Sequence, residues 1–148
     1  MRNGWGLAAL AAGLALAGPA RADLKRAMAE QNLEKRSQLA LENAASAYKS
    51  ARAAYEKGEN DKVAAAVAEV QESVDLAYKS LTDTGKDPRR SPKWFKKAEI
   101  DTRDLLKRLD AFDHEMSFSD RPMLEKVKAR VQQVHDELLV GLMEGKHK

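Results

Sequence analysis

SPKWFKKAEIDTRDLLKRLDAFDHEM, residues 91–116, is the stretch that decides the fold of this chain. Seven positions in this stretch, most of them apolar, follow one another in steps of three and four residues. This spacing places them in one stripe along one side of an α-helix. The positions of the stripe are Phe95, Ala98, Thr102, Leu105, Leu109, Phe112 and Met116. A helix with one apolar stripe cannot bury that stripe alone. The sequence therefore predicts a helix over 91–116 that packs against partner helices.

The segments before this helix supply two partners. Residues 23–57 contain no Pro or Gly and are rich in good helix formers, so they are predicted to form one long helix that ends at Gly58. Asn60 is a suitable N-cap for a second helix over 61–84. A turn this short makes the two helices antiparallel neighbours.

The segment after residue 116 supplies a third partner. Ser119 is its predicted N-cap, and Phe118 and Met123 have the spacing of a hydrophobic staple. Apolar residues continue at helical spacing to Leu142, while Gly141 and Gly145 are expected to weaken the end of the helix. We therefore expect a helix from about residue 120 to about residue 145.

No segment alternates with period two for long enough to form a strand, so the fold class is all-α. Four helices with short connectors predict an antiparallel up-down four-helix bundle. The alternative is two packed helical hairpins, as in a repeat protein.

The first 22 residues are typical of a cleavable signal peptide. Arg2 is followed by the apolar run Leu7–Ala17 and by Ala20-Arg21-Ala22, a small-x-small cleavage site. The run is too short to span a membrane, which takes about 20 residues. We therefore expect a signal peptide at 1–22, a helical domain at 23–145, a polar tail at 146–148, and a periplasmic or extracellular protein.

Charge and cysteine content narrow the function further. Removal of 1–22 takes away two arginines and no acid, so the formal net charge of the chain falls from +3 to +1. A net charge this close to zero does not indicate a protein that binds nucleic acid. Cysteine is absent, so no disulfide supports the domain after export.

Known catalytic patterns are missing from the sequence. The three histidines, His114, His135 and His147, do not have the spacing of a zinc or di-iron site. Serines lack a nucleophile-elbow context, and the glycines stand singly rather than in a phosphate loop. The sequence thus predicts a protein that is not an enzyme and holds no metal.

A basic cluster is the main candidate binding site. It lies within twelve residues around the start of the 91–116 helix, where free N–H groups and the helix dipole favour an anion. Its members are Lys86, Arg89, Arg90, Lys93, Trp94, Lys96 and Lys97. A solvated connector would also account for the charge. The expected partner is an envelope protein or an anionic lipid headgroup, with a homo-oligomer left open.

One family resemblance suggests an alternative function. The start of the exported chain, Asp23-Leu24-Lys25-Arg26-Ala27-Met28, is similar to that of the cytochrome b562 family, exported four-helix bundles that hold haem between a Met and a His. The resemblance implies Met28 as one axial ligand and His135 or His147 as the other. The preferred interpretation is a non-catalytic binding or scaffolding module with no cofactor; the alternative is a b-type haem carrier.

Overall fold

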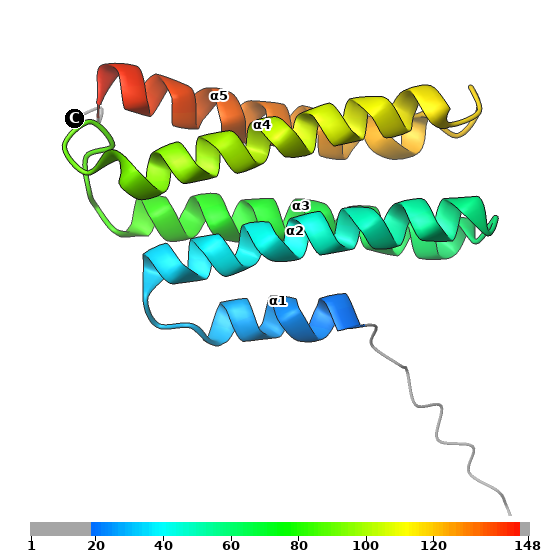
Figure 1. Cartoon of the computed structure of the whole chain (residues 1–148), viewed down its shortest axis with the longest axis horizontal. Helices are drawn as coiled ribbons and strands as arrows, with labels where there is room; N and C mark the ends of the chain where they lie inside the picture. Colours follow the sequence, from blue (N-terminus) through cyan, green and yellow to red (C-terminus); the bar gives the residue numbers. More distant parts are fainter. Residues whose placement is uncertain (1–18, 146–148) are drawn as a thin grey trace, which may run out of the picture.

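The computed structural model describes residues 19–145, and this part of the chain is all-helical (Figure 1). It contains the five helices α1 (Pro19–Ala29), α2 (Leu33–Glu56), α3 (Asn60–Asp83), α4 (Pro92–Glu115) and α5 (Pro122–Glu144). The all-α prediction is confirmed. The count of four is not, because the segment predicted as one helix over 23–57 forms two.

The break between α1 and α2 is a turn at Glu30–Asn32. Asn32 adopts an extended backbone, and its side chain accepts a hydrogen bond of 2.9 Å from the Lys35 N–H, which caps α2. Arg36 Nε donates to the Glu30 carbonyl at 2.7 Å and so ties the two helices together. The turn folds α1 back onto the hairpin made by α2 and α3, where Leu24 and Ala27 are buried. A continuous helix would leave these two side chains without partners.

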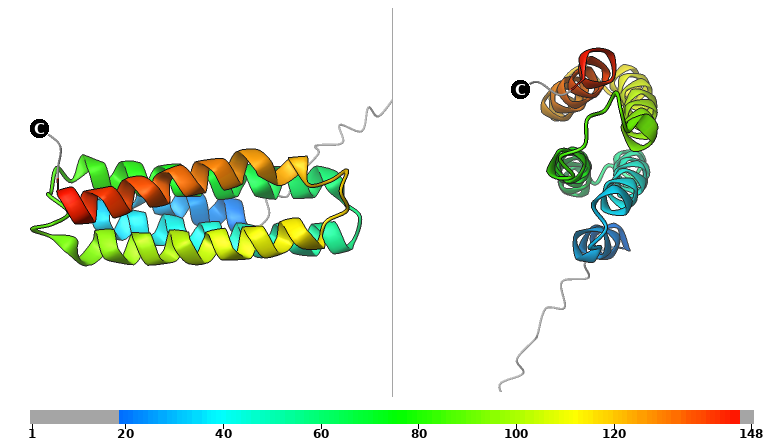
Figure 2. Two further views of the ribbon diagram at one scale, coloured as in Figure 1. Left: turned by 90° about the horizontal axis from the view of Figure 1, so that it is seen from above. Right: turned by 90° about the vertical axis from the view of Figure 1, so that its left-hand side faces the viewer.

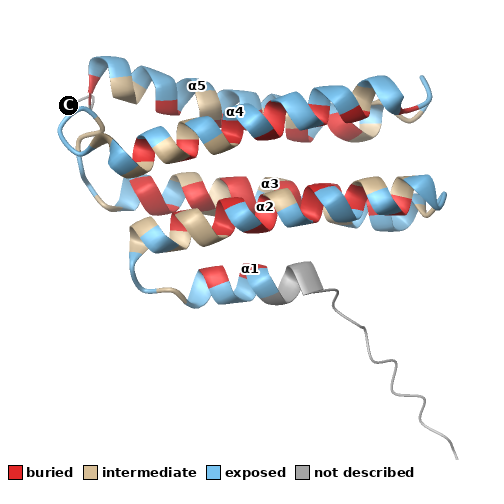
Figure 3. Ribbon diagram, viewed as in Figure 1, coloured by how far each residue is buried: buried red, intermediate tan, exposed pale blue. Residues whose placement is uncertain are grey.

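The helices are stacked in layers, as the end-on view in Figure 2 shows. α1 contacts only α2 and α3, whereas α4 packs on α2 and α5 packs on α3. The α2–α3 hairpin therefore lies between α1 on one side and the α4–α5 hairpin on the other. Buried residues face the spaces between the layers (Figure 3).

The predicted stripe of the 91–116 segment is confirmed in full. All seven of its positions, from Phe95 to Met116, are buried, and none has an exposed fraction above 5%. Across the core, α2 contributes mainly alanines and α3 mainly valines. Small side chains let these two helices approach each other closely, which explains why their contact is the most extensive in the molecule.

The observed helix ends agree with those predicted from the sequence at some positions only. Gly58 has the positive φ expected of the glycine predicted to end a helix, and Gly85, which follows α3, has a positive φ as well. Asn60 is not an N-cap, because α3 begins at Asn60 itself and Glu59 precedes it. Ser119 is not an N-cap either: a turn over 118–121 intervenes and Arg121 takes that position. Phe118 is 86% exposed, so the predicted staple with Met123 does not form.

The signal-peptide prediction falls mostly on residues 1–18, which lie outside the described residues. The predicted cleavage site, residues 20–22, is within α1. None of the helices within 19–145 combines the length and the apolar character that a membrane crossing requires.

Candidate functional site: the basic end of the bundle

The connector between α3 and α4, residues 84–91, forms the end of the molecule where the basic cluster lies. Asp87 organises this connector: its carboxylate accepts from the Arg89 N–H at 2.8 Å, and its carbonyl accepts from the N–H groups of Arg90 and Ser91 at 3.1 and 2.9 Å. Such an aspartate-centred turn fixes the backbone that carries the two arginines.

The end of α5 supports the connector from the other side. A Cβ placed on Gly141 would lie 3.2 Å from Cγ of Pro88, and one on Gly145 would lie 3.1 Å from Cδ of Arg89. These glycines leave room for the connector to pack on α5. From the sequence, both glycines are expected only to weaken the end of the helix; α5 continues through Gly141 to Glu144.

Four members of the predicted cluster have partners of their own. The Lys86 ammonium pairs with Glu34 of α2 at 2.6 Å, and the Lys97 ammonium pairs with Asp101 at 3.1 Å. Lys93 Nζ lies 5.0 Å from the centre of the Trp94 ring, a cation–π contact, and Trp94 is half-buried against the core. Lys86 and Lys97 are therefore less available to a ligand than the sequence suggested.

Arg89, Arg90 and Lys96 remain as exposed cations that form no ion pair with any residue in the range 19–145. The two arginines line a hollow of about 360 Å³ together with Asp87 and Glu144. Ser91 is the N-cap of α4 by position, but its side chain makes no capping hydrogen bond, and Pro92 follows it. The Ser91 side chain therefore does not cap the first N–H groups of α4, and these groups can donate hydrogen bonds to an anion.

A second cavity, of about 420 Å³, lies under the same connector between α3 and α5. Its walls come mainly from Phe95 of α4, Pro88 of the connector, and Leu138 and Val140 of α5. Tyr78 of α3 also lines it and donates a hydrogen bond to Glu137 of α5. Burial, followed by this hydrogen bond, raises the pKa of Tyr78 to about 12. No feature of the sequence indicated this cavity, because it depends on how the connector crosses the two helices.

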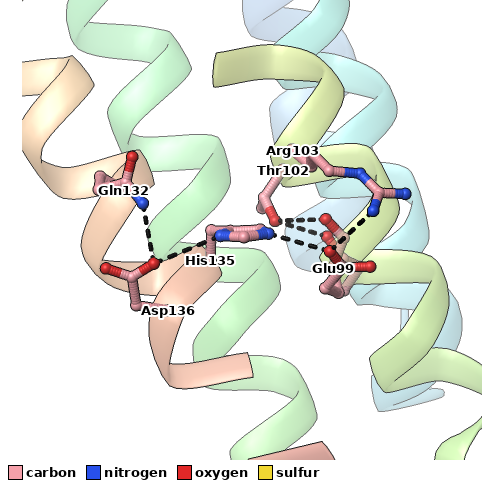
Figure 4. Close-up of polar contacts among 7 residues, drawn as sticks. Glu99, Thr102, Arg103, Gln132, His135 and Asp136 are labelled. Carbon is pink, nitrogen blue, oxygen red and sulfur yellow. Dashed lines mark hydrogen bonds and ion pairs between the residues drawn. The ribbon is translucent and has the colours of Figure 1, made fainter. Parts of the chain in front are cut away.

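His135 belongs to a polar cluster between α4 and α5 (Figure 4). Its Nε2 lies 3.0 Å from a carboxylate oxygen of Glu99, and both side chains are nearly buried. Arg103 approaches the same carboxylate at 3.5 Å, and Asp136 lies 3.4 Å from His135 Nδ1. This arrangement joins the two helices of the hairpin. Within 19–145, no group of three or more His, Asp or Glu side chains is arranged so that it could hold a metal ion.

The structure does not bring the suggested haem ligands together. Met28 is exposed on α1, whereas His135 faces α4 from α5, and the α2–α3 hairpin lies between them. His147 lies outside the described residues.

The chain matches no protein-family model and no curated protein.

Proposed function

We propose that this protein is an exported, non-catalytic binding module whose basic end docks on anionic, phosphate-bearing lipid headgroups of the cell envelope. The observation that carries the proposal is the set of exposed cations, Arg89, Arg90 and Lys96, at the N-terminus of α4. Guanidinium groups match the geometry of phosphate oxygens, and the free N–H groups of a helix N-terminus add further donors.

Charge balance around the connector supports this choice. Asp87 and Glu144 share the hollow with the two arginines, so the hollow itself holds equal numbers of acids and bases. Lys93 and Lys96, within the first five residues of α4, are exposed and add two positive charges next to the connector. A phosphate placed between the arginines would be attracted most strongly at low ionic strength, because salt screens exposed charges.

Vesicle co-sedimentation tests the proposal. The purified protein is expected to sediment with vesicles that contain phosphatidylglycerol and to stay in solution with vesicles of pure phosphatidylcholine. The triple variant Arg89→Ala, Arg90→Ala and Lys96→Ala should lose most of this binding. The control removes three other cations far from the connector, Lys49→Ala, Lys57→Ala and Lys126→Ala, and should bind as the wild type does.

Two results would overturn the proposal. Equal loss in both triple variants would mean that only the total charge matters. No binding to any vesicle, with the basic end still capturing an acidic envelope protein, would assign the surface to a protein partner instead.

A further inference from the structure

The 420 Å³ cavity between α3 and α5 is separate from the basic surface and suggests a second kind of ligand. Its volume falls in the range of sites that hold small molecules, roughly 300–1,000 Å³. Leu138 and Phe95 form its floor and are almost fully buried, while Val140 is 41% exposed at its edge. The cavity therefore opens to solvent and could receive an apolar group without rearrangement of the core.

Charged groups around the cavity are predominantly acidic. Asp136 and Glu137 contribute two carboxylates, and Lys86 contributes the one ammonium in the lining. The charge of Lys86 is already matched by Glu34, 2.6 Å away. At the other end, Gly145 lies beside both Arg89 and Asp87, whose charges offset each other.

Hydrogen bonds hold the two carboxylates in place. Glu137 accepts from Gln133 at 3.0 Å and from the Tyr78 hydroxyl, and Asp136 accepts from Gln132 at 2.8 Å. Asp136 also lies 3.4 Å from Nδ1 of His135. Gln132, Gln133 and Tyr78 are neutral donors, so these three side chains orient the carboxylates without cancelling their charge. An ammonium group at this position would gain a charge-assisted hydrogen bond.

We infer that this cavity binds a small cationic amphiphile, with an ammonium group against Asp136 and Glu137 and an aliphatic body on Leu138, Val140, Phe95 and Pro88. Asp136 and Glu137 lie eight and seven residues before Glu144, the last residue of α5, an axial rise of about 11–12 Å at about 1.5 Å per residue. A short alkyl chain that starts at the acids can therefore extend along the cavity toward the connector. This site is independent of the proposed lipid-headgroup surface.

Calorimetric titration with three matched probes tests the inference: octylamine, octanol and octanoate, each below its aggregation concentration. Octylamine is expected to bind with one molecule per chain and about tenfold more tightly than octanol, since one charge-assisted hydrogen bond contributes at least that factor. Octanoate should bind most weakly.

Two variants locate the binding. Asp136→Asn with Glu137→Gln should reduce the affinity for octylamine to that for octanol, while Glu72→Gln with Glu125→Gln, which removes two exposed acids outside the cavity, should change nothing. Val140→Trp fills the partly exposed edge of the cavity and should weaken both octylamine and octanol.

The inference is overturned if octanoate binds more tightly than octylamine, which would identify Lys86 as the recognition group, or if none of the probes binds. Equal affinities for all three probes would also overturn it, because they would show that the cavity binds apolar chains without selecting for an ammonium group. None of these results bears on vesicle binding, so the two proposals fail separately.

Discussion

At the scale of single residues, the core contains one polar contact that fixes how α2 and α3 pair. Asn43 and Ser73 are buried, and the Asn43 amide donates to the Ser73 hydroxyl at 2.8 Å. The Asn43 side-chain oxygen is buried and has no hydrogen-bond partner among the residues that the structure describes. A buried polar group of this kind tolerates little change, because an unmade hydrogen bond costs more than a made one contributes.

Replacing Ser73 with Ala should therefore destabilise the protein by about 1–3 kcal/mol, since it leaves the Asn43 amide without its acceptor. Chemical denaturation measures the change. Ser50→Ala, on the exposed face of α2, is the matched control and should stay within about 0.5 kcal/mol. The double variant Asn43→Ala with Ser73→Ala should cost less than the sum of the single changes; strict additivity would show that the two side chains do not interact.

Tyr78 gives a pH-dependent prediction at the same scale. Its pKa is raised from 10.0 to about 12 in the folded protein, so the fold favours the neutral phenol. The resulting stabilisation is fully present below pH 10 and is lost as the pH rises toward 12. Tyr78→Phe cannot titrate, so the stability difference between wild type and variant should shrink over that interval. A difference that stays constant from pH 9 to 12 in urea titrations would contradict the assignment.

At the scale of elements, the turn between α1 and α2 depends on Asn32. Its side chain supplies the cap of α2, and the turn lets α1 fold back on the α2–α3 hairpin. Asn32→Ala should lower the free energy of unfolding by about 0.5–2 kcal/mol. The neighbouring exposed Gln31→Ala provides the comparison and should be nearly neutral. Hydrogen exchange should also become faster in α1; unchanged protection there would mean that α1 holds its place without the cap.

At the scale of the whole molecule, stability depends on the packing between the α2–α3 and α4–α5 hairpins. Leu109 of α4 is 1% exposed in this core, whereas Leu139 of α5 is 40% exposed. Leu109→Ala should cost about 2–5 kcal/mol, because it removes buried surface and leaves a cavity, and Leu139→Ala should cost much less. Thermal unfolding measures both. Similar melting temperatures for the two variants would show that the hairpins do not share a common core.

Sequence periodicity determined the all-α class and the exact buried face of α4, because a period of 3.6 residues admits only one face for a stripe such as Phe95 to Met116. The sequence also located Gly58, which ends α2, and the start of α4. Within the candidate site, the sequence indicated a basic cluster of seven residues that includes Arg89, Arg90 and Lys96, but not which of its members pair with acids. These features are local, so the residue pattern alone was sufficient.

Tertiary structure decided the rest. The helix break at Glu30–Asn32 follows from where Leu24 and Ala27 can be buried, which is on the α2–α3 hairpin once α1 folds back against it. Three further features arise from segments that are distant in sequence. They are the pairing of Lys86 with Glu34, the separation of Met28 from His135, and the cavity under the connector. Such features depend on how helices of similar composition stack, and the energy differences among these arrangements come from side-chain packing across layers rather than from any local pattern.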